Sequence, residues 1–225
     1  MPLERVAADG WLTEDEITQA VHAALDADDY DGKRALFIVP DGTRSMPMSI
    51  VFRAICAALR GRAQQVDFLI ALGTHPPMPE PAILKHFGLS AEERAETYGD
   101  VGIYNHAWQD PDALMHIGTL EERDVAELSL GRLHQRVEVT INKRVLDYDR
   151  VCVVGPVFPH EVVGFSGGNK YFFPGVSGAE VLNMFHWLGA LITNYNINGT
   201  KDTPLRQVIN RAAAMIPTEK RAFCL

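Results

Sequence analysis

The sequence predicts an α/β protein whose mostly parallel sheet carries helices on both faces, in a Rossmann-like, doubly wound arrangement. Three short apolar runs support this prediction, at Ala35–Val39, Val66–Leu72 and Arg150–Val154. Each run has a length typical of a buried strand and is followed by turn-forming residues. Segments with helical spacing of apolar residues lie between the runs, and such an alternation of strands and helices is typical of a parallel sheet.

The first half of the chain begins with an expected helix at residues 14–27, where Thr13 precedes acidic residues and an apolar stripe. A threonine at this position is a typical N-cap. After the first strand, Met48–Arg60 carries its apolar residues on one helical face. After the second strand, Pro79–Phe87 predicts a short helix with proline in its first turn.

The second half is less regular, because residues from Tyr98 to Thr140 alternate only weakly between apolar and polar. No closing element is expected after the last helix. The remaining expected elements are short strands around Ile103, at Leu114–Ile117 and at Val137–Ile141, and helices at Gly178–Ile192 and Leu205–Met215.

The composition suits a single α/β domain over residues 1–225, with 47% hydrophobic residues and a net charge of −8. No block of Lys and Arg exceeds two residues, which argues against a nucleic-acid partner. No segment reaches the roughly 18 apolar residues of a membrane helix, and no signal-peptide pattern is present, so a cytoplasmic protein with no membrane partner is expected. Cys56 and Cys152 are expected to be buried thiols, and no cysteine pair has zinc spacing.

Polar residues of catalytic type follow each of the three strands. Asp41, Thr43 and Arg44 follow the first strand, His75 the second and His160 the third. Ligands of open parallel sheets bind outside the carboxyl ends of the strands, so these side chains are expected to converge. Two histidines facing each other suit proton transfer, and Arg44 suits a carboxylate. Asp41 and Thr43 could equally cap the following helix, whose N-terminus would favour a phosphate.

A glycine-rich segment follows His160. Glycine lets backbone N–H groups approach a ligand, so this composition favours anion binding. Lys170 lies inside the segment, but Asn169 before it and Tyr171 after it depart from the phosphate-binding loop of NTPases. A solvated lysine in a flexible loop is one interpretation. The aromatic residues after Lys170 favour another, a partly buried amine with a lowered pKa and nucleophilic character.

His186 lies in the helix that follows this segment, between Phe185 and Trp187. It is interpreted either as a packed core histidine or as a metal ligand. A zinc site would have to combine it with His75 or His160 through space. Weaker candidates are His106 and His116, whereas His22, His86 and His134 are expected at the surface.

Taken together, these motifs resemble the nickel-pincer-nucleotide-dependent lactate racemases and their relatives. The resemblance extends from about Ala35 to His186 and includes the ten- and sixteen-residue steps from His160 to Lys170 and from Lys170 to His186. The matching segments are Asp41-Gly-Thr-Arg44, Gly73-Thr-His75-Pro-Pro-Met, Asn105-His-Ala-Trp-Gln-Asp-Pro, and Pro159-His160 through Gly-Phe-Ser-Gly-Gly-Asn-Lys170 and Pro174-Gly175 to His186.

The resemblance implies a cofactor and a role for each matching residue. The cofactor is nickel held by pyridinium-3,5-bisthiocarboxylic acid mononucleotide, the nickel-pincer nucleotide. Lys170 matches the lysine tethered to it through a thioamide, and His186 matches the protein ligand of nickel. His75 and His160 match the acid–base histidines, and Arg44 matches a residue near the substrate. The segments expected to contact the cofactor contain Asp41, Thr43, Ser166, Gly167 and Gly168.

The implied reaction is racemisation of a small 2-hydroxy acid through a hidden redox cycle, with cofactor-synthesis enzymes as further partners. Family members are longer and carry a second domain that nothing in this chain matches. The chain is therefore expected to be a fragment, a truncated relative or one half of a split enzyme, which forms a homo-oligomer or joins a separate C-terminal half. An exposed apolar patch is expected from Phe172, Phe173 and Trp187.

Two other functions remain open from the residues alone. A metal-dependent hydrolase would place His75, His160 and His186 around zinc, although it leaves Lys170 and the glycine-rich segment without a role. A non-catalytic nucleotide-binding or cofactor-carrier module would need no second domain.

Overall fold

The structure is a computed structural model that describes residues 3–224. Its main sheet has five strands in the order β3-β2-β1-β6-β9, and every neighbouring pair is parallel. This confirms the predicted α/β class and parallel sheet. The strands are β1 (Arg34–Pro40), β2 (Gln65–Ala71), β3 (Ile103–Asn105), β6 (Arg150–Gly155) and β9 (Glu219–Cys224).

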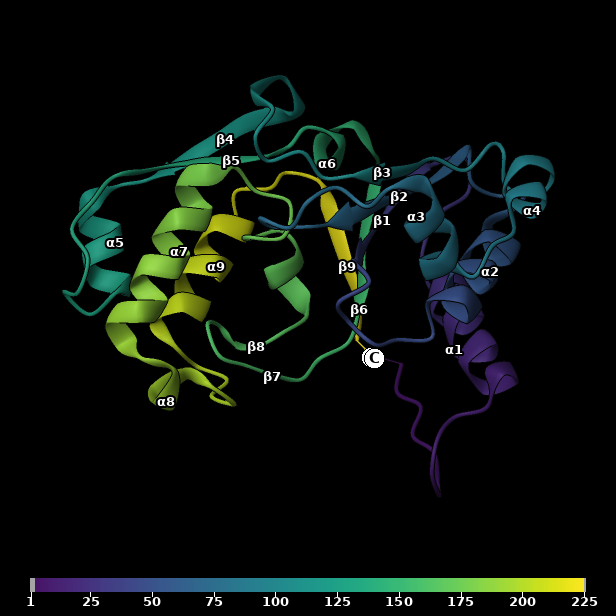
Figure 1. Cartoon of the computed structure of the whole chain (residues 1–225), viewed down its shortest axis with the longest axis horizontal. Coiled ribbons are helices and arrows are strands. Elements are labelled where there is room, and N and C mark those ends of the chain that lie inside the picture. The colour runs from purple at the N-terminus through teal and green to yellow at the C-terminus, as the bar shows by residue number, and fades with distance from the viewer. Residues whose placement is uncertain (1–2, 225) are drawn as a thin grey trace.

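Helices cover both faces of the sheet. Alternate side chains of each strand therefore enter two separate cores. In β1, Leu36 and Ile38 belong to one core, whereas Phe37 and Val39 belong to the other. Figure 1 shows the two layers on either side of the sheet. One layer holds α1 (Glu14–Asp26), α2 (Met48–Leu59), α3 (Glu80–Phe87) and α4 (Ala91–Glu96), and the other holds α7 (Ala179–Ile192), α9 (Pro204–Ala213) and the short 3₁₀ helix η2 (Gly168–Tyr171).

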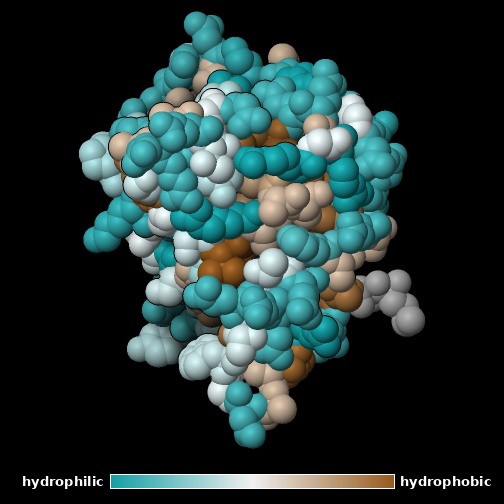
Figure 2. Space-filling view, turned by 90° about the vertical axis from the view of Figure 1, so that its right-hand side faces the viewer, coloured by the Kyte–Doolittle hydropathy of each residue, from teal (hydrophilic) through white to brown (hydrophobic). Residues whose placement is uncertain are grey.

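The α1–α4 layer presents a mostly polar outer surface. Figure 2 faces this side of the molecule and shows hydrophilic side chains around a band of hydrophobic atoms. Within residues 3–224, no helix is long and apolar enough to span a membrane.

The winding of the sheet changes direction between β1 and β6. From β1 the chain passes through β2 to β3 at one edge, whereas β6 lies on the other side of β1 and β9 lies beyond it. Such a reversal separates the two following loops and leaves a crevice at the carboxyl ends of the strands. The strand exits singled out in the sequence belong to β1, β2 and β6, so they surround this point.

The weakly alternating region forms a separate antiparallel pair, β4 (Leu114–Leu120) and β5 (Val137–Asn142), which packs on α7. The expected strands in this region are thus confirmed, but two of them lie outside the main sheet. The smaller elements are η1 (Pro111–Ala113), α5 (Glu122–Leu128), α6 (Arg144–Asp147), β7 (Pro159–His160), β8 (Gly164–Phe165) and α8 (Asn194–Ile197).

The expectation that no element closes the chain after the last helix is wrong, because β9 pairs in parallel with β6 along its whole length. Its segment Glu219-Lys-Arg-Ala begins with charged side chains instead of an apolar run. An edge strand is held by backbone hydrogen bonds on one side and tolerates charged side chains, so its sequence need not be apolar. Cys56 and Cys152 are buried, as expected.

Candidate functional site

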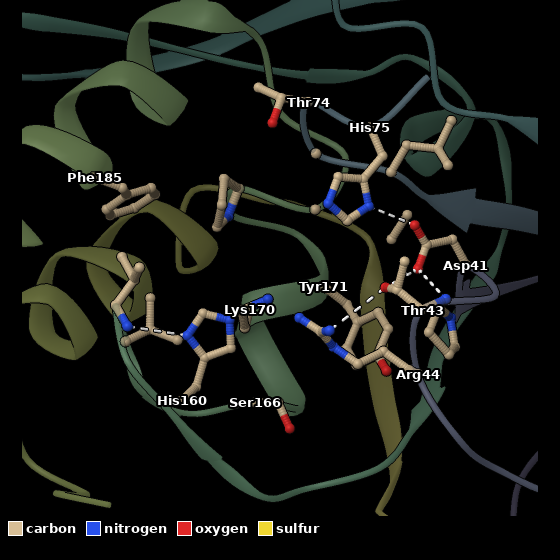
Figure 3. A pocket seen from close by; sticks show the side chains of 18 of the residues that line it. Asp41, Thr43, Arg44, Thr74, His75, His160, Ser166, Lys170, Tyr171 and Phe185 are labelled. Carbon is tan, nitrogen blue, oxygen red and sulfur yellow. Dashed lines mark hydrogen bonds and ion pairs between the residues drawn. The ribbon is translucent and has the colours of Figure 1, made fainter. Parts of the chain in front are cut away.

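The three strand exits and the glycine-rich segment line one pocket of about 200 Å³ at the carboxyl ends of β1 and β2. This volume is below the roughly 300–1,000 Å³ usual for small-molecule sites, so the pocket by itself does not enclose a nucleotide-sized ligand. Figure 3 shows the side chains that enter it. Of the predicted site residues, all but Gly168 line the pocket: Asp41, Thr43, Arg44, His75, His160, Ser166, Gly167, Lys170 and His186.

Asp41 follows β1 and organises the first strand exit. Its buried carboxylate accepts hydrogen bonds from the Thr43 backbone N–H at 3.1 Å, from Thr43 Oγ1 at 2.5 Å and from His75 Nδ1 at 2.5 Å. Burial alone would raise the pKa of Asp41, but the hydrogen bonds from Thr43 and His75 outweigh it and lower that pKa. The alternative role as a helix N-cap is wrong, because Pro47 occupies the N-cap of α2 and receives no side-chain bond.

The loop that carries His75 is fixed from two directions. Asn105, at the end of β3, accepts a hydrogen bond from the Met78 N–H at 3.0 Å and donates one to the Met78 carbonyl at 2.9 Å. The Gly73 N–H donates to the Gly175 carbonyl at 2.9 Å, which joins this loop to the glycine-rich segment. The His75 side chain remains 49% exposed, so its ring is held in place yet open to a ligand.

His160 is placed differently from the simple strand exit that the sequence predicts. It lies in β7, which pairs with β8, and its side chain is only 9% exposed. The Ser166 hydroxyl supports this segment by donating to the Pro156 carbonyl at 2.8 Å and accepting from the Phe158 N–H at 3.0 Å. Burial, and then the nearby Lys170 ammonium, lower the pKa of His160 to about 4.

Lys170 lies in η2 and not in a flexible loop, so the solvated-lysine interpretation is wrong. Burial, followed by the charge of Arg44, lowers the pKa of Lys170 to about 8. An amine with a pKa close to neutral is an effective nucleophile. The aromatic residues after it, Phe172 and Phe173, are 1% and 0% exposed and anchor the turn in the core beneath the sheet. Their expected contribution to an exposed patch is therefore wrong, whereas Trp187 is 58% exposed.

Arg44 lines the pocket, and its positive charge contributes to lowering the pKa of the Glu161 carboxyl, which lines the same pocket. The Arg44 guanidinium stacks over the Phe158 ring at 5.6 Å and donates to Thr43 Oγ1 at 3.4 Å. Neither partner is anionic. An arginine in this state suits the carboxylate of a ligand.

His186 is exposed on α7 and lines the pocket, so the interpretation as a packed core histidine is wrong. Its neighbour Phe185 is the residue that enters the core. Across residues 3–224, no group of three or more His, Cys, Asp and Glu side chains is arranged to hold a metal ion. The zinc hydrolase, which needs His75, His160 and His186 around one ion, is not supported by this geometry. A single imidazole fits instead a metal whose other donors come from a ligand.

The sequence gives little indication of the residues that hold the pocket together. His106 is 1% exposed, donates from Nε2 to the Ser177 carbonyl at 3.0 Å and accepts at Nδ1 from Asn142 at 3.2 Å. Burial lowers the pKa of His106 to about 4, so this ring is neutral and clamps the chain that follows Lys170. Its signal in the sequence is the Asn105-His106 pair directly after a strand.

The other histidines divide between supporting and surface positions. His86 is expected at the surface from the sequence, but it is half-buried and donates to the carbonyl of Pro40, next to Asp41, at 2.9 Å. His22, in α1, is also half-buried, contrary to expectation. His134 is exposed as expected, and the exposed His116 pairs with Glu138 at 2.5 Å.

Known proteins are similar to this chain in sequence and in fold. The family model of the lactate racemase N-terminal domain matches residues 13–198. The lactate racemase of Lactiplantibacillus plantarum is 27% identical over 158 residues, and that of Thermoanaerobacterium thermosaccharolyticum is 25% identical over 160 residues. Each alignment covers 69% of this chain but only 33% of the relative.

Two solved structures have a similar fold. A Thermotoga maritima protein determined by a structural genomics consortium has a TM-score of 0.84 and 30% identity, over 95% of this chain and 51% of that chain. The apoprotein of the T. thermosaccharolyticum lactate racemase has a TM-score of 0.69 and 22% identity, over 93% of this chain and 49% of that chain. The chain thus spans a third to a half of the length of the relatives that it matches.

Proposed function

This chain belongs to the family of lactate racemase N-terminal domains, and on that premise we propose that it forms the cofactor-holding and proton-transferring part of a 2-hydroxy acid racemase. One observation carries the proposal. A desolvated lysine, two histidines and an arginine that forms no ion pair within residues 3–224 line a single pocket at the point where the sheet reverses its winding. Perturbed titratable groups gathered in a cleft are characteristic of a catalytic site.

The residues present fit a nickel-pincer nucleotide. Desolvation lowers the pKa of the Lys170 amine to about 8, which suits attachment through a thioamide, and the single imidazole of His186 would complete the coordination of a nickel ion. Gly167 has a φ of 83°, and a Cβ there would lie 2.5 Å from Val157, so only glycine fits at this part of the cofactor-binding segment. When bound, the cofactor supplies the acceptor and donor of the Cα hydride.

The chain's own side chains orient the substrate and move its proton. Arg44 binds the carboxylate of the 2-hydroxy acid with its guanidinium fork. His75 and His160 remove and return the hydroxyl proton. Their rings lie on opposite sides of Lys170 in Figure 3, so they can reach the substrate from two directions. The two enantiomers present the hydroxyl on opposite sides of the reacting carbon, so racemisation needs a proton-transferring group on each side, which accounts for two histidines in one pocket. The curated relatives are lactate racemases, and we propose a small substrate of that class.

A second domain or chain is needed to complete this site. The pocket is too small to enclose the reactants, and exclusion of water normally accompanies closure over an active site. We therefore propose that the chain works with a further C-terminal half, supplied in the same or a separate polypeptide, and that alone it has negligible racemase activity. The proposed partners are this half, the small 2-hydroxy acid and the enzymes that synthesise the cofactor.

Intact-protein mass spectrometry tests the attachment site. The chain is co-expressed with nickel-pincer synthesis enzymes, and its mass is expected to increase by one cofactor. Lys170→Ala should abolish this increase, whereas Lys85→Ala, which removes an exposed lysine on α3, should keep it. An adduct that persists in the Lys170 variant would show that the cofactor is attached elsewhere.

Chiral chromatography of D- and L-2-hydroxy acids then distinguishes a racemase function from a cofactor-carrier function. The loaded chain should racemise only when the C-terminal half is supplied. Loading without turnover in the completed assembly would favour the non-catalytic cofactor carrier, which the limited overlap with the curated relatives also accommodates.

A further inference from the structure

The hydrogen bond between His75 and Asp41 determines which ring nitrogen of His75 carries its proton. His75 Nδ1 lies 2.5 Å from Asp41 Oδ2, and an ionised carboxylate only accepts hydrogen bonds. Asp41 is held ionised, since its hydrogen bonds from Thr43 and His75 lower its pKa. Nδ1 must therefore carry the proton, which leaves Nε2 of a neutral His75 with a lone pair.

His160 has the reverse arrangement. Its Nδ1 lies 3.1 Å from the backbone nitrogen of Val162, and a backbone N–H only donates. The carboxylate of Glu161 is 3.6 Å from the same ring nitrogen, beyond hydrogen-bond distance. Nδ1 therefore accepts, and the single proton of neutral His160 must be on Nε2.

In Figure 3 the remaining nitrogen of His160 points toward Lys170, and that of His75 points into the pocket, away from Asp41. We propose that the resting site holds its two histidines in opposite tautomers, with His75 presenting a bare nitrogen and His160 presenting an N–H, and that Asp41 is the positioning residue that sets the tautomer of His75. The roles below rest on the proposed function, but the tautomers themselves do not.

Opposite tautomers make the two histidines chemically different before any substrate binds. The hydroxyl proton of a bound 2-hydroxy acid transfers to Nε2 of His75: the O–H bond breaks, its electron pair stays on oxygen, and the new imidazolium faces the Asp41 carboxylate. His160 first acts as a neutral hydrogen-bond donor to a substrate oxygen. It becomes a base at Nε2 only after its proton moves to Nδ1, which breaks the bond from Val162.

The charges around each ring agree with this division. His75 faces the anionic Asp41, which stabilises an imidazolium. His160 faces three cations, Lys170, Arg44 and Arg206, and one anion, Glu161. A net positive surrounding disfavours a second proton on His160.

Nitrogen NMR of the chain without cofactor reads the tautomers directly. The chain is labelled with ¹⁵N-histidine, and long-range ¹⁵N–¹H correlation spectra near neutral pH distinguish protonated from bare ring nitrogens. His75→Gln and His160→Gln assign the two signals. We expect protonated Nδ1 in His75 and protonated Nε2 in His160. Either ring in the other tautomer would overturn the proposal, whether or not the chain loads cofactor.

Variants at two carboxylates test the role of Asp41. Asp41→Ala and Asp41→Leu both remove the acceptor, and in either variant the proton of His75 should move to Nε2, while His160 is unchanged. Glu161→Gln is the matched control beside the other histidine, and it should move neither tautomer. The buried His106, whose Nε2 proton is fixed by Ser177, reports that each variant is folded. A His75 that keeps its Nδ1 proton in a folded Asp41 variant would refute the assignment of Asp41.

Discussion

His75 and His160 enter one pocket from opposite sides, but the chain holds them in different ways. His75 is half exposed and its ring is bonded to a carboxylate, whereas His160 is nearly buried and its ring is bonded to a backbone N–H. The surroundings differ as well, since Asp41 lies beside the first ring and Lys170 beside the second. Two residues that look alike in the sequence thus acquire distinct chemistry from their partners, which determine both proton position and charge.

The largest expected effect comes from replacing either of the two histidines. In an active chimaera that joins this chain to the C-terminal half of the T. thermosaccharolyticum lactate racemase, His75→Gln and His160→Gln should each lower the racemisation rate roughly 10²–10⁴-fold, the usual contribution of a general acid–base group. Chiral chromatography measures the rate, and His134→Gln at an exposed position is the control. Parental activity in either variant would remove that histidine from the mechanism.

Loss of the carboxylate should have a smaller effect, because His75 itself remains. Asp41→Ala in the same chimaera is expected to lower the rate roughly 10²-fold through a misoriented ring. The control is Glu92→Gln on the exposed side of α4. An unaltered rate would indicate that the bond between Asp41 and His75 has no part in turnover.

Burial and the cations around His160 predict a pH effect at this residue, and the buried His106, whose pKa is also lowered to about 4, adds to it. The folded-state pKa of His160, about 4, lies below the ordinary 6.5, so the unfolded chain binds the proton more tightly. The free energy of unfolding should therefore decrease as the pH falls from 6.5 toward 4. Lys170→Met removes the neighbouring cation but not the burial, so the pKa of His160 should rise while staying below 6.5. NMR titration measures this, and a pKa that stays at about 4 would exclude Lys170 as a cause.

The smallest effects concern the two clamps that hold the histidine segments. Asn105→Ala releases Met78 in the His75 loop, and Ser166→Ala releases Pro156 and Phe158 before His160. Each variant should lower the free energy of unfolding by about 1–3 kcal/mol, as expected when buried partners lose their hydrogen bonds. Denaturant unfolding measures the loss. Histidine NMR signals should move for the adjacent ring only, and equal movement of both would show that the two segments are coupled.

The runs of apolar residues in the sequence predict the strands that are buried on both faces. The strands at Ala35–Val39, Val66–Leu72 and Arg150–Val154 are apolar because each packs against helices on two faces, and that requirement is visible in the sequence. The pattern does not predict β9, because the position of this strand depends on backbone pairing with β6, which leaves no apolar signature. The exposure expected for Phe172 and Phe173 is wrong for a related reason, since their burial depends on distant parts of the chain.

The candidate site is predictable as a set of residues. Polar side chains that follow neighbouring parallel strands must meet at one edge of the sheet, so the sequence alone groups Asp41, Arg44, His75 and His160. The supporting residues cannot be found in this way. His106 resembles any other histidine in the sequence, and only its contacts with Ser177 and Asn142 reveal a buried, neutral clamp.

The sequence by itself therefore determined the α/β class, the strands of the sheet and the residues available for chemistry, because these depend on periodicity and on which residues follow each strand. The tertiary structure decided what those residues are able to do. It placed a carboxylate against His75, a backbone N–H against His160 and a low-dielectric environment around Lys170. Tautomers and pKa values depend on partners and solvent exposure, and both arise only when segments distant in the sequence are packed together.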